Sequence, residues 1–238
     1  MVASDPNDPR SPAAPDPAAG ERYLLLADIS GYTSFLAGVE EAHGVDFSEG
    51  TPAGYPVLGA LLGAISDGLA SGFAVVKYEG DAVFAAAPAA GLDGQGDRVL
   101  DELQAVYEAF IAIRTAAVAV SDHVCTACPA VARLDLKMVL HRGPIVRQSV
   151  GTSSDLLGPA VTAAHRLLKN TVRDHFGSGP YLFMTDAAST GLGVGDAGRQ
   201  HLETYPDIGT VRGQVVPLGT LPTQPSVAVP LQPIRIVN

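Results

Sequence analysis

The sequence has no tryptophan, only 2 cysteines and no long apolar run that is free of charges. Two cysteines cannot form a disulfide framework, and they are too few to complete a zinc site by themselves. The most apolar window, residues 55–76, is broken by a proline, by several glycines and by Asp67, and the next, residues 105–120, carries Glu108 and Arg114. Because charges are costly at the centre of a bilayer, we expect both windows to fold as parts of a globular protein.

Positive charge is also scarce, because 15 Lys and Arg residues stand against 25 Asp and Glu residues, for a formal net charge of −10. Non-specific binding of nucleic acid requires Lys and Arg to neutralise phosphates, so we expect no nucleic-acid partner. A nucleotide is not excluded, because a bound metal ion can offset its charge. The N-terminus lacks the basic segment and apolar run of a secretory signal, and we therefore expect a cytoplasmic protein without a membrane partner.

The residues that are present predict a single domain with two tails. The 238 residues are 47% hydrophobic and 17% charged, which is typical of a globular protein with a core. Residues 1–20 are dominated by proline, alanine and aspartate, and we expect them to be disordered because they cannot bury enough apolar surface. Residues 217–238 are rich in proline and are predicted to form an extended arm that packs on the domain or on a partner. The domain itself is predicted to span residues 21–216.

Apolar runs and helical periodicities alternate within this domain. We expect strands at 22–28, 73–78, 82–87, 133–141, 145–150 and 181–184 with a last pair within 201–218, and helices at 31–42, 57–70, 98–120, 157–172 and from 186. Tight turns at 79–81 and at the Arg-Gly-Pro sequence 142–144 join strands directly. This mixture predicts an α+β fold with helices packed on one face of the sheet, rather than a doubly wound parallel sheet.

The first cluster of candidate site residues is the segment 25–33, Leu-Leu-Ala-Asp-Ile-Ser-Gly-Tyr-Thr. Asp28 comes at the end of a buried strand, where α/β proteins commonly place ligand-binding groups. Gly31 and Thr33 lead into a helix, whose first N–H groups can bind phosphate oxygens. Taken alone, the segment is equally compatible with Asp28 or Ser30 as a simple helix cap.

Two further clusters follow later in the chain. Residues 77–81, Lys-Tyr-Glu-Gly-Asp, place Asp81 at a glycine turn between two strands, although glycine and aspartate favour such turns for steric reasons alone. The third cluster consists of His-Arg-Gly-Pro at 141–144, then Asp-Leu-Leu-Gly at 155–158, then Thr162 with His165 and Arg166 in a predicted helix. Thr162 and Arg166, four residues apart, share one face of that helix, which is either a solvated face or a binding face.

The combination of these clusters is more specific than any one of them. Asp28 and Asp81 each lie where a strand meets a turn, so their carboxylates converge if the two strands are neighbours. Paired carboxylates that bind one or two magnesium ions are a common way to hold a triphosphate. The sequence therefore predicts a metal-dependent nucleotide site, and this prediction depends on the convergence of the two side chains.

Over residues 23–213 the order and spacing of the motifs resemble the homology domain of class III adenylate and guanylate cyclases, in a divergent branch. The family pattern Phe-x-Asp-Ile-x-Gly-Phe-Thr is similar to residues 26–33, and Lys-x-x-Gly-Asp is similar to 77–81. His-x-Gly is similar to 141–143, and the Asp-x-x-Gly that precedes a helix is similar to 155–158. The resemblance implies a ferredoxin-like nucleotidyl cyclase fold with a mostly antiparallel sheet.

The resemblance also implies a metal site and a base-reading pair. Asp28, Asp81 and the carbonyl group of Ile29 match the groups that bind two Mg²⁺ or Mn²⁺ ions in this family. Lys77 and Asp155 match the pair that reads the edge of adenine. A lysine donor and a carboxylate acceptor complement the ring nitrogen and the amino group of adenine, which implies ATP rather than GTP as the substrate.

Further roles follow from the later motifs. Arg166 matches the arginine that stabilises charge on the phosphoryl group being transferred. Thr162 stands where the family usually has an asparagine that orients the ribose. Arg212 is the nearest match to a late lysine that binds phosphate. The remaining substrate-binding positions that the resemblance implies lie in the first motif: Ser30, Gly31, Tyr32 and Thr33.

In this family the metal-binding aspartates come from one subunit and the base-reading and transition-state residues from the other, so the resemblance implies a homodimer. The implied reaction is attack of the ribose 3′-oxygen of ATP on the α-phosphorus, which forms cyclic AMP and releases pyrophosphate. The alternatives are a catalytically inactive cyclase-fold module that binds nucleotide or a protein partner, a purely structural dimer unit and a metal-dependent hydrolase. Thr162 and the missing lysine favour the inactive module, whereas the paired aspartates argue against the structural unit.

Cys125 and Cys128, preceded by His123, form an insertion that the family pattern lacks. They are either two small buried residues in a loop or a redox or metal switch. In the second case His123 or a residue of a second subunit would complete a zinc site. Both interpretations stay open on the sequence alone.

Overall fold

The structure is a computed structural model that describes residues 18–44, 46–48, 50–52, 54–119 and 127–219. Most of the two predicted tails, residues 1–17 and 220–238, lies outside the described residues, so the predictions for these segments stay predictions. Within the described part of the chain, no helix is both long enough and apolar enough to cross a membrane.

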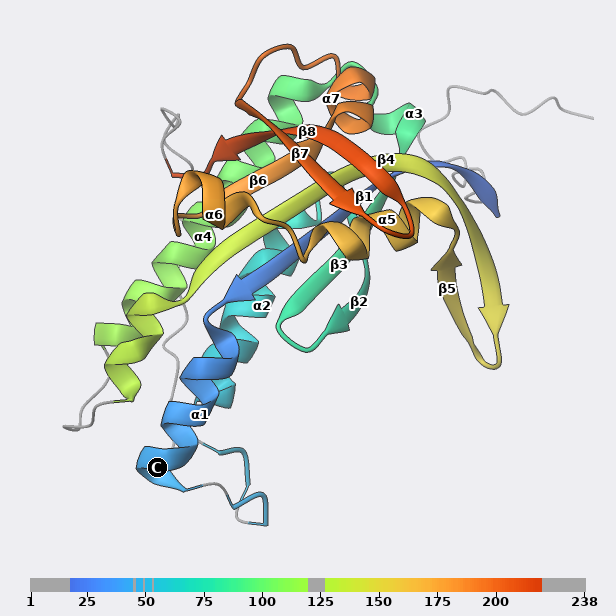
Figure 1. The fold of residues 1–238 in the computed structure, drawn as a ribbon. Helices are drawn as coiled ribbons and strands as arrows, with labels where there is room; N and C mark the ends of the chain where they lie inside the picture. The colour runs from blue at the N-terminus through green and yellow to red at the C-terminus, as the bar shows by residue number, and fades with distance from the viewer. Residues whose placement is uncertain (1–17, 45, 49, 53, 120–126, 220–238) are drawn as a thin grey trace, which may run out of the picture.

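The centre of the fold is one mixed sheet with the strand order β2-β3-β1-β4-β6-β8-β7, and β5 pairs with β4 outside this order (Figure 1). Every pairing is antiparallel except that of β4 with β6. The predicted α+β class with a mostly antiparallel sheet is therefore confirmed. The strands are β1 (Ala19–Ser30), β2 (Ala74–Glu79), β3 (Ala82–Pro88), β4 (Asp135–Val150), β5 (Ser153–Leu157), β6 (Tyr181–Thr185), β7 (Arg199–Tyr205) and β8 (Gly209–Pro217).

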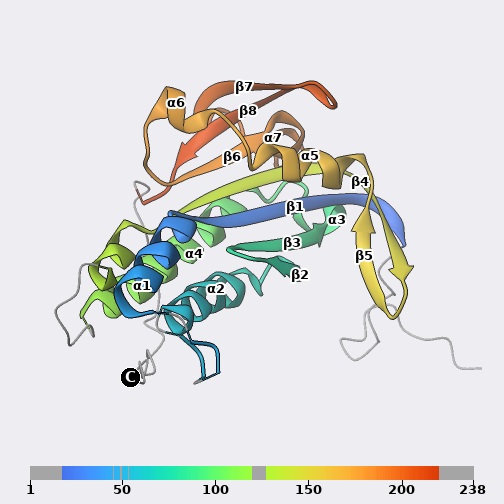
Figure 2. The same ribbon diagram turned by 60° about the horizontal axis from the view of Figure 1, so that its bottom comes forward.

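Helices cover both faces of this sheet, which corrects the expectation of helices on one face. Figure 2 shows α1, α2 and α4 on one side and α5 and α6 on the other. The reason lies in β1, where Leu25 and Ala27 pack into one buried cluster and Leu24 and Leu26 into a second. The helices are α1 (Tyr32–His43), α2 (Tyr55–Leu69), α3 (Ala89–Leu92), α4 (Gly96–Ala119), the 3-10 helix η1 (Cys128–Arg133), α5 (Pro159–Leu167), α6 (Val172–Phe176) and α7 (Asp186–Leu192).

β4 is one continuous strand, and the predicted turn at 142–144 is wrong. Pro144 pairs with Glu21 of β1 inside the ladder, and the chain turns only at Gly151, which has a φ of 62°. Gly143 serves a different purpose, because a Cβ at this position would lie 2.8 Å from the Cβ of Ala160 in α5. The glycine therefore lets α5 approach the sheet, and the β4–β5 hairpin extends as an arm (Figure 1).

The single helix predicted over 157–172 is wrong as well, because the chain forms a strand end and two helices there. Gly158 has a φ of 130°, a conformation that separates β5 from α5. Asn170 lies between α5 and α6 and links their ends, because its side chain donates to the Leu167 carbonyl at 2.7 Å and accepts from the Val172 N–H at 3.2 Å. Asp155 consequently lies in a strand and not at the start of a helix. The remaining predicted elements are confirmed, with boundaries that differ by a few residues.

Candidate functional site

The two aspartates of the predicted metal site lie at the same end of neighbouring strands. β1 and β3 pair antiparallel with Asp28 opposite Ala82, and the Ile29 N–H donates to the Asp81 carbonyl oxygen at 3.0 Å. The pKa of Asp81 is raised, first because the side chain is partly buried and second because the Asp28 charge is near. The two aspartates therefore lie at the ends of paired strands with their charges near one another, and whether their carboxylates share a cation stays a prediction.

Lys137 is a member of this cluster that the sequence reasoning missed. It lies opposite Asp28 across the β1–β4 ladder, and its Nζ is 3.1 Å from Asp28 Oδ2. The same ammonium donates to the Leu168 carbonyl at 3.2 Å, and its charge acts to lower the pKa of Asp81. The sequence did contain a signal for this role of Lys137, because it is a single basic residue between the apolar and buried residues Leu136 and Met138.

The donor set of this cluster fits a hard divalent cation. Carboxylate oxygens are the ligands that Mg²⁺ prefers, and Mg²⁺ usually keeps several waters and binds phosphate oxygens of a substrate. No group of three or more His, Cys, Asp or Glu residues that could hold a metal occurs among the described residues, so the protein contributes few ligands. The Ser30 Oγ is buried and has no partner among these residues, although it shares a strand face with Asp28. It is a polar atom available to a ligand.

The start of α1 borders the same cluster. Gly31 takes a left-handed conformation with a φ of 89°, and its carbonyl accepts from the Phe35 N–H at 2.9 Å. Burial, together with nearby Tyr55 and Asp81, raises the pKa of the Tyr32 hydroxyl. The first turn of α1 contains no acidic residue, so its N–H groups remain suited to an anion.

The predicted base-reading pair meets in space although its members are 78 residues apart. Lys77 Nζ in β2 donates to Asp155 Oδ2 in β5 at 3.2 Å, and both side chains are about one third exposed. Burial acts to lower the pKa of Lys77, but hydrogen bonds to Asp155 and Glu79 outweigh it and raise that pKa. The Leu156 N–H and the Lys77 ammonium keep the pKa of Asp155 below its usual value.

Glu79 and His165 complete this second cluster, and the sequence reasoning assigned no role to either. Glu79 Oε1 lies 3.2 Å from Lys77 Nζ, and His165 Nε2 lies 3.1 and 3.0 Å from the two carboxylate oxygens of Glu79. Residues two apart in a strand point to the same face, so the position of Glu79 relative to Lys77 could have indicated it. The position of His165 depends on how α5 packs and had no such signal.

The two predicted catalytic residues lie on the surface of α5. Thr162 Oγ1 donates to the Gly158 carbonyl at 3.4 Å, which is a contact within the first turn of its own helix. Arg166 is about half exposed, and its Nε donates to Asp207 Oδ2 at 2.7 Å. Asp207 belongs to the turn between β7 and β8, so Arg166 is paired within the chain.

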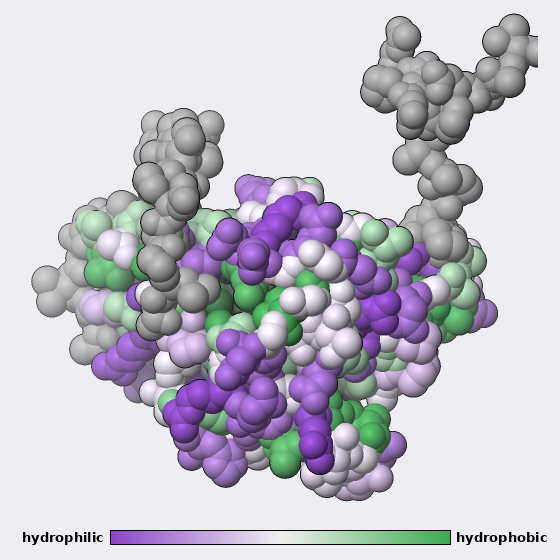
Figure 3. Space-filling model, turned by 90° about the horizontal axis from the view of Figure 1, so that it is seen from above, coloured by the Kyte–Doolittle hydropathy of each residue, from purple (hydrophilic) through white to green (hydrophobic). Residues whose placement is uncertain are grey.

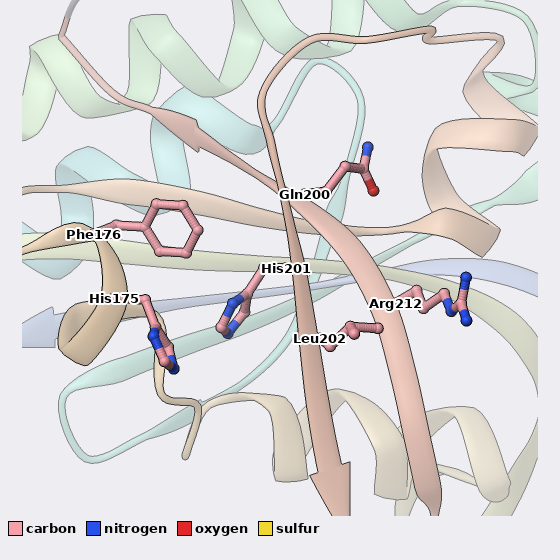
Figure 4. A pocket seen from close by; sticks show the side chains of 6 residues that line it. All are labelled: His175, Phe176, Gln200, His201, Leu202 and Arg212. Atoms are coloured by element: carbon pink, nitrogen blue, oxygen red, sulfur yellow. The ribbon is translucent and has the colours of Figure 1, made fainter.

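Arg212 lies on β8 and lines a hollow of about 560 Å³. Figure 4 shows the rings of His175, Phe176 and His201 grouped together, whereas the side chain of Arg212 extends from the neighbouring strand away from them. The other predicted site residues are absent from the described lining of this hollow. The structure therefore does not bring Arg212 to the aspartate cluster or to the Lys77 cluster.

His141, from the predicted His-x-Gly motif, is largely buried in β4. Its Nδ1 lies 3.1 Å from Thr185 Oγ1 in β6, and burial lowers the pKa of the imidazole to about 4. The ring is consequently neutral near pH 7, and the motif serves packing, since Gly143 gives α5 its space.

Cys128 starts η1, and its Sγ lies 3.4 Å from Nε2 of His43 at the end of α1. His123 and Cys125 lie outside the described residues, so the predicted alternatives for the cysteine pair are not tested. His43 is thus a neighbour of the cysteine insertion. Only the tertiary structure could indicate this contact, because 85 residues separate His43 from Cys128 in the chain.

On the face of the molecule that Figure 3 shows, polar and apolar residues are intermixed. Three of the larger apolar side chains that are exposed belong to the β4–β5 arm. They are Val146, Val150 and Leu157, with exposed fractions of 47%, 57% and 41%. This arm offers apolar contact area to a partner molecule.

The architecture defines the class of protein, because solved cyclase domains share it. The chain is similar to the guanylyl cyclase Cya2 with a TM-score of 0.59 and 15% identity, over 85% of this chain and 94% of that one. It is similar to the adenylyl cyclase CyaB from P. aeruginosa with a TM-score of 0.54 and 16% identity, over 83% and 94%. It is also similar to a bacterial light-regulated adenylyl cyclase, with a TM-score of 0.57 and 19% identity, over 84% of this chain and 53% of that one. The protein thus has the nucleotidyl cyclase fold.

The particular family is shown by sequence. A family profile described as "Protein of unknown function (DUF2652)" matches residues 58–176, which is half of the chain, and the chain belongs to this family. The matched region includes Lys77, Asp81, Asp155 and Arg166. The chain is also 34% identical over 134 residues to "Uncharacterized protein Rv2561/Rv2562" of Mycobacterium tuberculosis. That match spans 54% of this chain and 57% of the length of that protein.

Proposed function

We propose that this protein is an adenylate cyclase-like enzyme that converts ATP into cyclic AMP and pyrophosphate at the interface of a homodimer. One observation supports the proposal above the others. Asp28 and Asp81 lie at the ends of paired strands, where the Ile29 N–H donates to the Asp81 carbonyl oxygen, and Lys77 contacts Asp155 from a distant part of the chain. One pair suits a divalent cation and the other suits the edge of a purine.

Asp28 and Asp81 would hold Mg²⁺ or Mn²⁺, with the Ile29 carbonyl as a further ligand. When bound, such ions would offset the charge of the triphosphate and make the ribose 3′-hydroxyl easier to deprotonate. Lys137 neutralises Asp28 in the protein alone, and its ammonium would turn to a phosphate oxygen when Asp28 takes another partner. Ser30 Oγ and the first N–H groups of α1, at residues 31–33, would donate to the phosphates.

Lys77 would donate to the ring nitrogen of adenine beside its amino group, and Asp155 would accept from that amino group. Their contact at 3.2 Å supports this assignment, because the edge of adenine requires a donor and an acceptor that are close together. Arg166 would stabilise charge on the α-phosphate and Thr162 would contact the ribose. Arg166 must first leave Asp207, which holds it at 2.7 Å.

The homodimer is part of the proposal. One chain carries the cation-binding set and the base-reading set, so two copies related by a twofold axis would form two sites. The exposed apolar residues of the β4–β5 arm support a second copy as the partner. We also propose that residues 21–216 form the catalytic domain, that it acts in the cytoplasm, and that neither nucleic acid nor a membrane is a partner.

The direct test is an assay of the purified dimer with ATP and Mn²⁺ or Mg²⁺, with cyclic AMP as the product measured. Lys77→Glu should lower the preference for ATP over GTP, since it reverses the charge of the donor. Calorimetric binding of ATP without any product would instead support the inactive module. A folded dimer that neither binds ATP nor forms product with either metal would overturn the proposal.

A further inference from the structure

Beside the base-reading pair lies a second acid, which that pair does not require. Four charged or titratable side chains from three elements form one cluster: Lys77 and Glu79 of β2, Asp155 of β5 and His165 of α5. The buried ring of Phe84 lies under two of them, with Lys77 Nζ 5.8 Å from its centroid and the His165 ring packed edge-on at 5.1 Å. The cluster is therefore positioned by the sheet.

Lys77 is shared equally between two carboxylates. Its Nζ is 3.2 Å from Asp155 Oδ2 and 3.2 Å from Glu79 Oε1. These two acids would favour different bases. Adenine offers one amino group and one ring acceptor, which suit Asp155 and Lys77. Guanine offers two adjacent N–H groups and a carbonyl oxygen, which suit a free carboxylate that accepts two hydrogen bonds and an ammonium that donates one.

Glu79 is not free, because His165 holds both of its oxygens. His165 Nε2 lies 3.1 and 3.0 Å from Glu79 Oε1 and Oε2. The other ring nitrogen, Nδ1, lies 2.8 Å from the Val161 carbonyl oxygen, which can only accept. An N–H at Nε2 that donates to Glu79 occupies carboxylate oxygens that would otherwise be free to accept from a base.

We infer that His165 determines the purine specificity of this site by withholding Glu79 from the base. While His165 holds Glu79, Lys77 and Asp155 present the pattern that fits adenine. Without His165, Glu79 would pair fully with Lys77, weaken the donor that adenine needs, and present its own oxygens to the two N–H groups of guanine. His165 is a positioning residue in this scheme, since it acts through Glu79. The inference rests on the proposed function, because it concerns the base bound at the same site.

The test measures the affinities of the dimer for ATP and GTP by calorimetry, with Mn²⁺ present, in the wild type and in His165→Phe. Phenylalanine keeps an aromatic ring against Phe84 but donates no hydrogen bond. We expect the ratio of ATP to GTP affinity to fall by about tenfold, as for one good contact to a base edge. The double variant Glu79→Gln with His165→Phe should recover the wild-type ratio. His175→Phe, outside the cluster, is the matched control and should leave it unchanged.

A second readout needs no nucleotide. Nitrogen NMR of the imidazole in the free protein should show a hydrogen-bonded proton on Nε2 of His165, and Glu79→Gln should shift the signal of that nitrogen. A wild type that binds ATP, combined with an unchanged ratio in His165→Phe, would overturn this inference and leave the proposed function standing. A wild type that binds neither nucleotide would overturn both. An Nε2 of His165 that carries no proton would overturn the inference by itself.

Discussion

Charge is distributed unevenly among the side chains of the candidate site. Asp28 has the ammonium of Lys137 at 3.1 Å, whereas Asp81 has Asp28 as a near charge and a raised pKa. In the base-reading cluster, by contrast, Lys77 and His165 face the two acids Glu79 and Asp155. At the scale of single residues, the aspartate cluster is thus the place where an added cation has most to gain.

The first prediction concerns Asp81→Asn. Because the pKa of Asp81 is raised in the folded state, its ionised form costs stability at neutral pH, and the neutral amide should leave the cation-free protein equally stable or slightly more stable. The gain should stay below about 1 kcal/mol, since the group is partly exposed. Mg²⁺ or Mn²⁺ should raise the Tm of the wild type in calorimetry but not that of Asp81→Asn. Asp101→Asn, an exposed acid of α4, is the control, and equal metal effects in all three proteins would contradict the prediction.

The second prediction concerns pH and His141. Burial lowers the pKa of this imidazole from 6.5 to about 4, so the unfolded chain binds more protons than the folded protein between these values. Stability should therefore fall as the pH drops from 6.5 towards 4, by up to about 3 kcal/mol from this group. His141→Gln should flatten this part of the curve in chemical denaturation, although its stability near pH 7 will also change. An equally steep fall in the variant would show that other groups cause it.

At the scale of elements, the close approach of α5 to β4 determines where the binding face lies. α5 carries Thr162, His165 and Arg166, and it packs on β4 at Gly143, where a Cβ would meet Ala160. The same helix could begin only after Gly158, whose φ of 130° lets the chain leave the β5 strand. Two glycines thus bring the second half of the site to the sheet.

The third prediction follows from this packing. Gly143→Ala should destabilise the fold by about 1–3 kcal/mol, because the added methyl group must displace α5. Gly59→Ala, in α2, has open space around its Cβ and should leave stability unchanged or raise it by up to about 1 kcal/mol. Urea denaturation of both variants measures the difference. Similar stabilities would mean that α5 moves at no cost.

At the scale of the whole molecule, the cation-binding and base-reading clusters belong to one chain but would serve two different sites. The proposal therefore makes activity a property of the dimer, and loss of either cluster should leave the other competent in a mixed dimer. The turn between β7 and β8 also matters for the dimer, because Asp207 in this turn holds Arg166 at 2.7 Å in the single chain.

The fourth prediction uses mixed dimers. Asp28→Asn and Arg166→Gln should each abolish formation of cyclic AMP when purified alone. After the two variants are mixed and allowed to exchange subunits, half of the dimers would be mixed, and each would contain one intact site. Activity should therefore return to roughly a quarter of the wild-type level. No recovery despite demonstrated exchange would mean that each site is built from a single subunit.

Local chemistry in the sequence determined much of the fold and some of the site. The alternation of apolar runs and helical periodicities predicted most elements. Buried side chains recur about every 3.6 residues in a helix and every second residue in a strand, so their spacing indicates the type of element. Asp28 and Asp81 could be selected because each stands where a strand ends, and Lys77 with Asp155 because motif spacing matched a known pattern. The Arg-Gly-Pro sequence was misread, since glycine and proline in a row also occur in a strand where a helix comes close.

Only the tertiary structure decided which charges meet. Lys137 lies beside Asp28 because β4 pairs with β1 in one register, and His165 lies beside Glu79 because α5 packs on β4 and β1. The local sequence predicts neither contact, since each one joins segments that are far apart in the chain. The sequence by itself thus determined the element types and the reactive residues. The register of the ladder and the packing of one helix determined their partners, because electrostatic contacts depend on distance in space and not along the chain.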